Sequence, residues 1–215
     1  MANVLVINAS ARSGGSISRE LTHTFRETWL SSRPEDNVVD RDVGLNPPPI
    51  ISEEWIAACF TQPEERSQDQ HAILEMSDTL ISELEAADLV VIGTPMYNYG
   101  MPAALKAWVD QVVRINKTFS FDLDRGDWPL EPIFSGKTLV VFTSKGEFGF
   151  SPGNIREHMN FLDGHVGAVS HYLGVANRYF VHSEYQEFKD SRHEASKTAA
   201  FEEAAGLARK LSSGL

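Results

Sequence analysis

Cysteine and basic residues are scarce in this 215-residue sequence: Cys59 is the only cysteine, and 19 lysines and arginines face 30 aspartates and glutamates. A single cysteine excludes an intrachain disulfide, and its small apolar neighbours are more typical of a buried packing residue than of a catalytic thiol. The net charge of -11 argues against nucleic acid and anionic membranes as partners, because affinity for phosphate backbones depends largely on lysine and arginine.

Long apolar runs are missing as well. The run nearest the N-terminus, Val4 to Ile7, has four residues and no basic flank before it. It is far shorter than the apolar region of a signal peptide or a membrane-spanning helix. We therefore expect a cytoplasmic protein.

Common nucleotide-binding and metal-binding motifs do not occur. The sequence has no G-x-x-x-x-G-K-[ST] loop, Gly14-Gly15 does not complete G-x-G-x-x-G, and the acidic run from Asp122 to Asp127 lacks the spacing of a calcium loop. His158 and His165 are separated by about 10.5 Å along a predicted helix, too far to bind one zinc ion together. We expect no metal.

Short apolar runs alternate with helix-length segments along the chain. Unbroken β-branched runs are typical of parallel strands that helices cover on both faces, and they occur at residues 4–7, 38–39, 89–92, 139–142 and 175–181. The helical segments between and after them are residues 18–30, about 67–87, 103–114, 155–173 and 194–211. This alternation predicts an α/β fold, a flavodoxin-like doubly wound five-stranded parallel sheet with helices on both faces.

We expect residues 1–215 to form a single domain, because the length allows one substantial core and hardly two. Two segments interrupt the simple alternation, at about residues 44–60 and 116–136. Excursions of this length inside a compact domain usually cap or line a site, although an inert surface insertion is the alternative.

The loop after the first strand is rich in hydroxyls and glycine and leads into a helix. The N–H groups of a helix N-terminus, together with the hydroxyls of Ser10, Ser16 and Ser18, are suited to a phosphate. In the alternative interpretation, Ser16 or Ser18 only caps the helix. Gly14 to Ser18 also comes within one residue of the hydrolase motif G-x-S-x-G, but Ser18 stands where that motif needs glycine.

Two further loops follow apolar runs and belong at the same edge of the predicted sheet. Gly93 to Pro102 combines prolines that restrict the backbone, glycines that free it, and the planar side chains of Tyr97-Asn98-Tyr99. It predicts a rigid ligand-binding loop. Thr143 to Gly153 contains glycines whose neighbouring N–H groups can meet a negative charge.

These three loops resemble those of the flavodoxin-like quinone and azo-dye reductases, which are FMN-dependent NAD(P)H enzymes, and particularly their bacterial azoreductase branch. The matching residues are Ser10, Ser16-Ile17-Ser18, Pro95-Met96-Tyr97-Asn98-Tyr99, Pro102, Leu105, Lys106, Asp110 and Ser144-Lys145-Gly146. The resemblance covers most of the chain. One departure is Glu147, where the azoreductase branch often has glycine.

The resemblance implies how the chain binds FMN. The phosphate would lie on Ser10, Ser16, Ile17 and Ser18. The ring system would lie along Pro95, Met96, Tyr97, Asn98 and Tyr99, with N–H groups near Asn98 or Tyr99 directed at N5. Its pyrimidine edge would approach Ser144, Lys145, Gly146 and Glu147, where N–H groups around Lys145 and Gly146 would stabilise negative charge.

The resemblance also implies an activity: transfer of two electrons from NADH or NADPH to quinones and azo compounds, by ping-pong kinetics and without a protein nucleophile. A homodimer is the expected assembly, and the expected substrate contacts are Phe119, Phe121, Phe148, Phe161 and His165. The alternative is a flavodoxin-like electron carrier without small-molecule turnover, which the aromatic excursions argue against.

Overall fold

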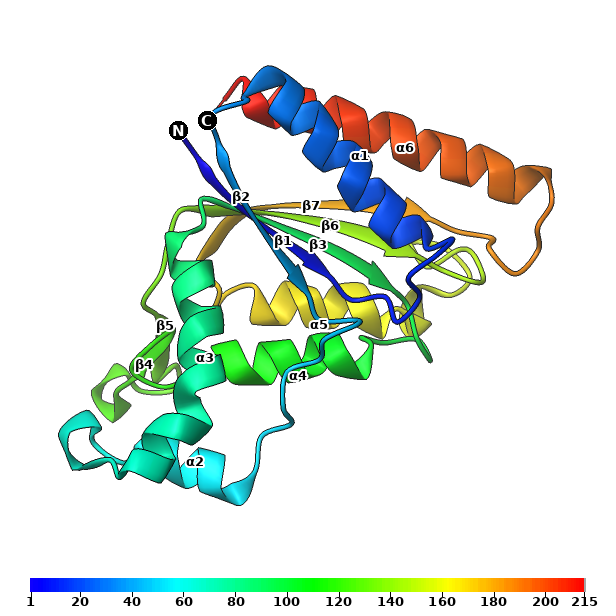
Figure 1. Cartoon of the computed structure of the whole chain (residues 1–215). Helices are drawn as coiled ribbons and strands as arrows, with labels where there is room; N and C mark the ends of the chain where they lie inside the picture. The colour runs from blue at the N-terminus through cyan, green and yellow to red at the C-terminus, as the bar shows by residue number, and fades with distance from the viewer. Residues whose placement is uncertain (215) are drawn as a thin grey trace.

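The computed structural model describes residues 1–214 and is built around a parallel sheet with helices on both faces (Figure 1). The predicted flavodoxin-like α/β fold is confirmed. The five strands run in the order β2-β1-β3-β6-β7 and are β1 (Asn3–Asn8), β2 (Asn37–Asp42), β3 (Leu89–Pro95), β6 (Lys137–Ser144) and β7 (Val175–Ser183). All neighbouring strands in this sheet pair in parallel.

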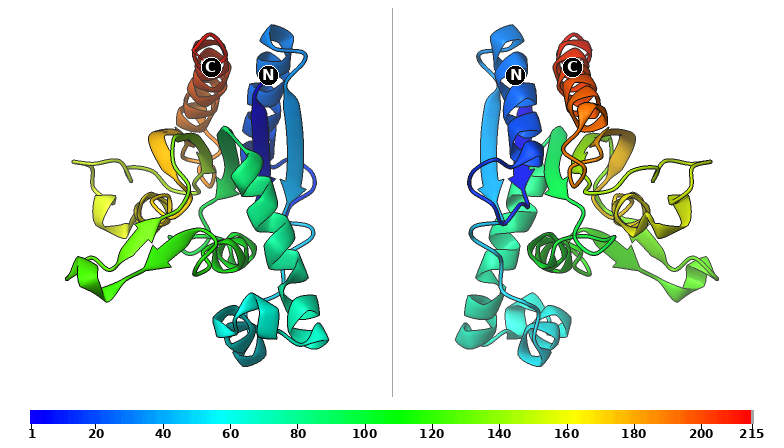
Figure 2. Two further views of the ribbon diagram at one scale, coloured as in Figure 1. Left: turned by 90° about the vertical axis from the view of Figure 1, so that its left-hand side faces the viewer. Right: turned by 90° about the vertical axis from the view of Figure 1, so that its right-hand side faces the viewer.

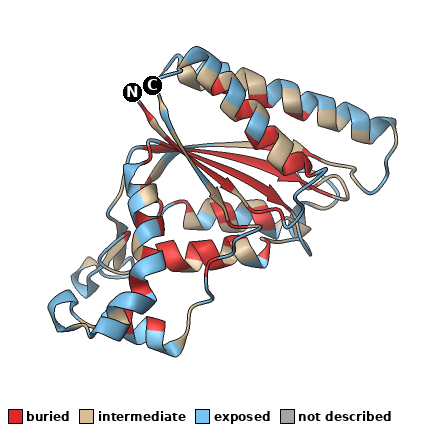
Figure 3. Ribbon diagram, viewed as in Figure 1, coloured by how far each residue is buried: buried red, intermediate tan, exposed pale blue. Residues whose placement is uncertain are grey.

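The helices divide into two layers (Figures 1 and 2). Helices α1 (Ile17–Ser32) and α6 (Ser191–Ser212) pack on one face, and the other face is covered by α3 (Gln68–Ala86), α4 (Ala103–Val112) and α5 (Phe161–Val169). Alternate residues of each central strand serve the two layers: Val4 and Val6 face α1, whereas Leu5 and Ile7 belong to the core beneath α3 and α4. Figure 3 shows that the central strands are buried along their length.

The predicted helix over residues 155–173 is the clearest error of the sequence analysis. A short 3-10 turn (Glu157–Met159) comes first, and α5 begins only at Phe161. The Asn160 side chain caps α5 by accepting a hydrogen bond from the N–H of Asp163. A polar residue that satisfies a free N–H at a helix start fixes that start against the hydrophobic periodicity around it.

Both excursions contain secondary structure. The first includes α2 (Glu53–Phe60), whose start is capped by the Ser52 side chain. The second contains an antiparallel hairpin of β4 (Phe119–Phe121) and β5 (Leu130–Pro132). Figure 1 shows the hairpin and α2 at the same end of the molecule, beyond the sheet.

The first excursion is anchored by polar contacts to α4. The indole N–H of Trp55 donates to Gln111 Oε1 at 3.0 Å, and Gln111 Nε2 donates to the carbonyl of Pro49 at 2.9 Å. Cys59 is buried beside Trp55, and its burial raises the pKa of the thiol to about 11. The thiol is therefore neutral near pH 7, as expected of a packing residue.

No helix within residues 1–214 is both long and apolar enough to cross a lipid bilayer.

Candidate functional site

A cavity of about 210 Å³ lies where β1, β3 and β6 end. The parallel register aligns these strand ends, because Asn8 of β1 is opposite Gly93 of β3, and Pro95 of β3 is opposite Ser144 of β6. All three expected loops therefore meet at one edge of the sheet. The cavity is lined by Ser10, Arg12, Ser16, Ile17, Pro95, Met96, Tyr97, Ser144, Gly146, Gln186 and Glu187.

The first loop presents buried hydroxyl groups at the start of α1. Ser10, Ser16 and Ser18 are all buried, and Ser16 occupies the N-cap position. Its side chain makes no capping hydrogen bond; Ser16 Oγ lies 3.4 Å from Ser18 Oγ instead. The capping interpretation therefore does not account for this hydroxyl. A helix N-terminus with a hydroxyl that makes no capping bond suits an anion such as phosphate.

The second loop is a tight turn held from both sides. The N–H of Tyr97 donates to the carbonyl of Gly100 at 3.1 Å, and the N–H of Gly100 donates back at 3.0 Å. The two residues between them, Asn98 and Tyr99, have φ values of 48° and 66°. Positive φ at both central positions is the feature of a type I′ turn. The positive φ values of the turn thus belong to Asn98 and Tyr99, whereas Gly100 does not adopt a positive φ.

This turn leaves two backbone donors free. The N–H groups of Asn98 and Tyr99 make no hydrogen bond to any residue within 1–214, and both residues are exposed. The turn is fixed to the sheet by the N–H of Met96, which donates to the carbonyl of Ser144 at 2.9 Å. A planar ligand lying along the turn would meet donors that no other group occupies.

The third loop is only partly available to a ligand. The N–H of Lys145 donates to the carbonyl of Ser183 at 2.8 Å and so continues the pairing of β6 with β7. Of the N–H groups expected around Lys145 and Gly146 to stabilise negative charge, that of Lys145 is therefore already paired within the sheet. Pairing between strands at a sheet edge is a long-range contact, which inspection of the loop sequence does not reveal.

A fourth loop, which the sequence analysis missed, completes the cavity. It follows β7 and contributes Gln186 and Glu187 to the lining. Its backbone is joined to the third loop, because the N–H groups of Gln186 and Glu187 donate to the carbonyls of Lys145 and Gly146 at 3.2 and 3.0 Å. The sequence could have indicated this loop, because it follows the fifth predicted strand and the carboxyl ends of all the parallel strands lie at one edge of the sheet.

Lys145 directs its side chain into the interior instead of the cavity. Its ammonium is fully buried, 3.0 Å from Asp163 Oδ2 and 5.4 Å from the centre of the Phe150 ring. Asn160 Nδ2 donates to the same carboxylate oxygen at 2.6 Å. The third loop is therefore tied to α5 by a buried ion pair.

A histidine completes this buried cluster. His182 Nδ1 is 2.7 Å from Thr143 Oγ1, and its Nε2 is 3.6 Å from Asp163 Oδ2. Burial, and secondly the charge of Lys145, lower the pKa of His182. The imidazole is therefore neutral near pH 7, while its position at the end of β7 keeps it close to the third loop.

Glu147 turns away from the cavity toward charged and polar neighbours. Its Oε1 is 3.0 Å from Arg156 Nη2, and its Oε2 accepts a hydrogen bond of 3.2 Å from the hydroxyl of Tyr99. This hydrogen bond to the carboxylate raises the pKa of Tyr99. The one residue that departs from the azoreductase pattern thus links the second loop to the third.

The residues expected to contact substrate do not line the cavity of this chain. Phe119 packs against Tyr172 with ring centres 5.4 Å apart, and Phe148 stacks on Tyr185 at 4.5 Å. Phe121 and Phe161 are exposed, and His165 is half-buried on α5. In one chain, therefore, none of these five side chains reaches the cavity.

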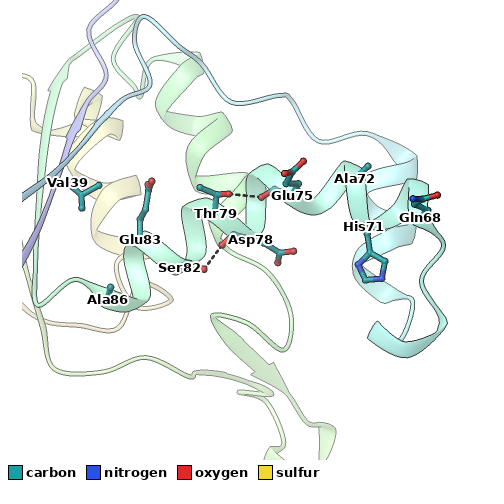
Figure 4. A pocket seen from close by; sticks show the side chains of 10 residues that line it. All are labelled: Val39, Gln68, His71, Ala72, Glu75, Asp78, Thr79, Ser82, Glu83 and Ala86. Atoms are coloured by element: carbon teal, nitrogen blue, oxygen red, sulfur yellow. Dashed lines mark hydrogen bonds between the residues drawn. The ribbon is translucent and has the colours of Figure 1, made fainter.

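A larger hollow of about 890 Å³ runs along α3 beside β2 (Figure 4). Several of its polar groups are committed elsewhere: the hydroxyls of Thr79 and Ser82 bond to carbonyls of their own helix, and Glu83 pairs with Arg41. No group of three or more potential metal ligands of the types His, Cys, Asp and Glu occurs in the part of the chain that the structure describes. The smaller cavity at the strand ends is therefore the candidate site.

Known proteins resemble this chain in sequence and in fold. Residues 2–207 match the model of a family described by its flavodoxin-like fold. The chain is 53% identical to the FMN-dependent NADH:quinone oxidoreductase 2 of Colwellia psychrerythraea, over 98% of this chain and 100% of that one. It is 51% identical to the protein of the same name from Idiomarina loihiensis, over 99% and 91% of the two chains. An azoreductase crystal structure from Bacillus anthracis superimposes with a TM-score of 0.86, covering 98% of this chain and 100% of that one at 22% identity, a likeness of fold.

Proposed function

The chain belongs to the flavodoxin-like family that includes FMN-dependent NADH:quinone oxidoreductases, and we propose that it is an FMN-dependent oxidoreductase that transfers two electrons from NADH or NADPH to quinones. The observation that carries this proposal is the meeting of the three motif-bearing loops at one cavity. It agrees with the rule that ligands of doubly wound sheets bind at the carboxyl ends of the strands.

The residues at the cavity fit FMN. The buried hydroxyls of Ser10 and Ser16 and the first N–H groups of α1 would hold the phosphate, because Ser16 does not cap the helix. The ring system would rest along the turn after β3, where the N–H groups of Asn98 and Tyr99 are unpaired within residues 1–214. Ser144 and Gly146 would meet its pyrimidine edge. Bound FMN supplies the two-electron chemistry, and the protein orients it and sets its charge environment.

We extend the proposal to azo compounds as a second class of acceptor and to a ping-pong order of reaction. The turn that would carry the ring is exposed, so the electron donor and the electron acceptor would both approach the ring from this side. Since one exposed face serves both substrates, each must leave before the other binds. Parallel lines in double-reciprocal plots of NADH against quinone are the expected kinetic result.

We further propose that the working unit is a homodimer in the cytoplasm, where reduced pyridine nucleotides are kept. Large apolar side chains are exposed around the two excursions and after the third loop: Phe60, Ile73, Met76, Phe121, Leu123, Trp128, Ile133, Ile155 and Phe161. Large apolar side chains left exposed in this number are typical of a chain that has an interaction surface. A second copy would then bring Phe119, Phe121, Phe161 or His165 to the site that one chain leaves without them.

The homodimer is tested by sedimentation of the wild type and of Trp128→Glu, with Trp128→Tyr as the matched control. Trp128 is 85% exposed, so neither change disturbs the core. We expect a dimer for the wild type and the tyrosine variant and a weakened dimer for the glutamate variant. A monomeric wild type at micromolar concentration would contradict the assembly.

The activity is tested with the purified, flavin-loaded protein. We expect a yellow preparation that releases FMN on denaturation and oxidises NADH steadily in the presence of a soluble quinone. An azo dye should be decolourised in the same assay. Flavin-loaded protein without NADH-dependent turnover would favour the electron-carrier alternative, and a protein that stays colourless in excess FMN would end both interpretations.

A further inference from the structure

A charged pair is bonded to the backbone of the first loop and does not line the cavity. The guanidinium of Arg19, on the first turn of α1, makes two hydrogen bonds to the carboxylate of Asp42 at the end of β2, at 2.6 and 2.7 Å. The same guanidinium donates through Nη2 to the carbonyl oxygen of Ser10 at 2.6 Å. Neither residue lines the cavity.

The Ser10 carbonyl is enclosed from a second direction by the chain that follows β2. The N–H of Gly44 donates to the carbonyl of Asn8 at 2.9 Å, and a Cβ atom at Gly44 would overlap the Ser10 carbonyl oxygen. Asp42 Oδ1 also accepts a hydrogen bond from the N–H of Leu45 at 3.0 Å. The segment after β2 and the guanidinium of Arg19 thus leave one orientation for the Ser10 peptide group.

We propose that Arg19 and Asp42 are positioning residues that make the first loop selective for a phosphorylated flavin. The inference rests on the proposed function, because it assumes that FMN occupies the cavity. A carbonyl oxygen directed at a phosphate would repel it, whereas a carbonyl tied to Arg19 leaves the hydroxyl of Ser10 to face the anion. Asp42 holds the guanidinium of Arg19 in this orientation, so the pair, which is neutral overall, acts through the geometry of the Ser10 peptide group.

The pair is built for orientation and not merely for charge. A planar guanidinium that bonds both carboxylate oxygens has a fixed direction, which the flexible ammonium of lysine cannot reproduce. The bond from Arg19 lowers the pKa of Asp42, so the carboxylate stays ionised across the neutral range. The loop geometry is therefore expected to be independent of pH near neutrality.

The test compares the affinity of apoprotein for FMN with its affinity for riboflavin, which has the same ring and no phosphate. Fluorescence quenching of each flavin gives both dissociation constants. For Arg19→Gln we expect the dissociation constant of FMN to rise about tenfold, the effect of one charge-assisted hydrogen bond, and that of riboflavin to change less than about twofold. Arg19→Lys and Asp42→Asn should fall between this variant and the wild type.

Arg26→Gln is the matched control, because Arg26 lies two turns further along α1 and pairs with Glu27 and Asp40 instead of the loop. It should leave both affinities unchanged. Equal weakening of FMN and riboflavin in Arg19→Gln would assign the pair a purely structural role and overturn the inference, as would an unchanged FMN affinity. Failure of the wild type to bind FMN would instead contradict the proposed function itself.

Discussion

The hydroxyl of Tyr99 donates a hydrogen bond of 3.2 Å to Glu147 Oε2, so the turn after β3 is joined to the loop after β6. Arg156 neutralises the other oxygen of this carboxylate at 3.0 Å. A carboxylate in this position would disfavour negative charge on a nearby cofactor if it were unpaired. The guanidinium of Arg156 offsets that effect, and the two side chains are best understood as one neutral unit.

Substitution of Glu147 and substitution of Arg156 should shift the reduction potential of bound FMN in opposite directions. Glu147→Gln leaves a positive charge and raises the potential, whereas Arg156→Gln leaves a negative charge and lowers it. Both side chains are partly exposed, so solvent screens the remaining charge, and an interaction with the reduced cofactor of at most about 1 kcal/mol corresponds to a shift of about 20 mV or less for two electrons. Dye-equilibration titration measures the shift. Shifts of the same sign in both variants would refute the neutral-unit interpretation.

Ser16 and Ser52 both occupy N-cap positions, but only the Ser52 side chain caps its helix. We expect Ser16→Ala to raise the dissociation constant of FMN about tenfold, because a phosphate loses one hydroxyl donor. The free energy of unfolding of the apoprotein should change by less than about 0.5 kcal/mol. Fluorescence titration and urea unfolding give the two quantities.

Ser52→Ala is the control and should show the reverse pattern. Loss of a capping hydrogen bond lowers the free energy of unfolding by about 1 kcal/mol. FMN affinity should stay as in the wild type, since Ser52 does not line the cavity. If Ser16→Ala destabilises the apoprotein as much as Ser52→Ala and spares FMN binding, then Ser16 acts as a cap after all.

The buried ion pair of Lys145 and Asp163 should show strong coupling. Lys145→Met leaves a largely buried carboxylate without its charged partner, which lowers the free energy of unfolding by about 3 kcal/mol. Adding Asp163→Asn removes the unpaired charge and should restore part of that loss. Urea unfolding of the wild type, Lys145→Met, Asp163→Asn and the double variant forms the cycle. Lys117 is exposed, so Lys117→Met serves as the control and should change the free energy of unfolding little. An equally small change in Lys145→Met would show that the ion pair contributes little to stability.

His182 should make the folded protein sensitive to mild acid. Its pKa is lowered in the folded state by burial and by Lys145, so the unfolded chain takes up a proton at a higher pH than the folded chain does. Stability therefore falls as the pH drops from about 6.5, the ordinary pKa of histidine, to the lowered value. Urea unfolding of the apoprotein at pH 7.5 and 5.5 measures the loss.

His182→Asn should lose less stability than the wild type over this pH interval. The exposed histidine His71 provides the matched control, and His71→Asn should follow the wild type. An identical pH dependence in His182→Asn and the wild type would show that His182 does not account for the acid sensitivity.

Local pattern was sufficient to predict most of the scaffold. The five apolar runs became the five strands, because an unbroken β-branched run needs cover on both faces and the helical segments between the runs provide it. The N-terminal boundary of α5 could not be predicted in this way. One side chain, Asn160, caps the helix there, and hydrophobic periodicity does not report such a bond.

The candidate residues of the site could be read from the chain alone: the hydroxyl-rich first loop, the turn from Tyr97 to Gly100, and the segment that begins at Ser144 all follow apolar runs, and parallel strands end at one edge. How those residues are used depends on the packing of the folded chain. This packing pairs the N–H of Lys145 with Ser183, turns Glu147 toward Arg156, and bonds Arg19 to Ser10. These contacts join residues distant in the chain or on separate elements, and their geometry depends on how strands and helices pack, which no local pattern records.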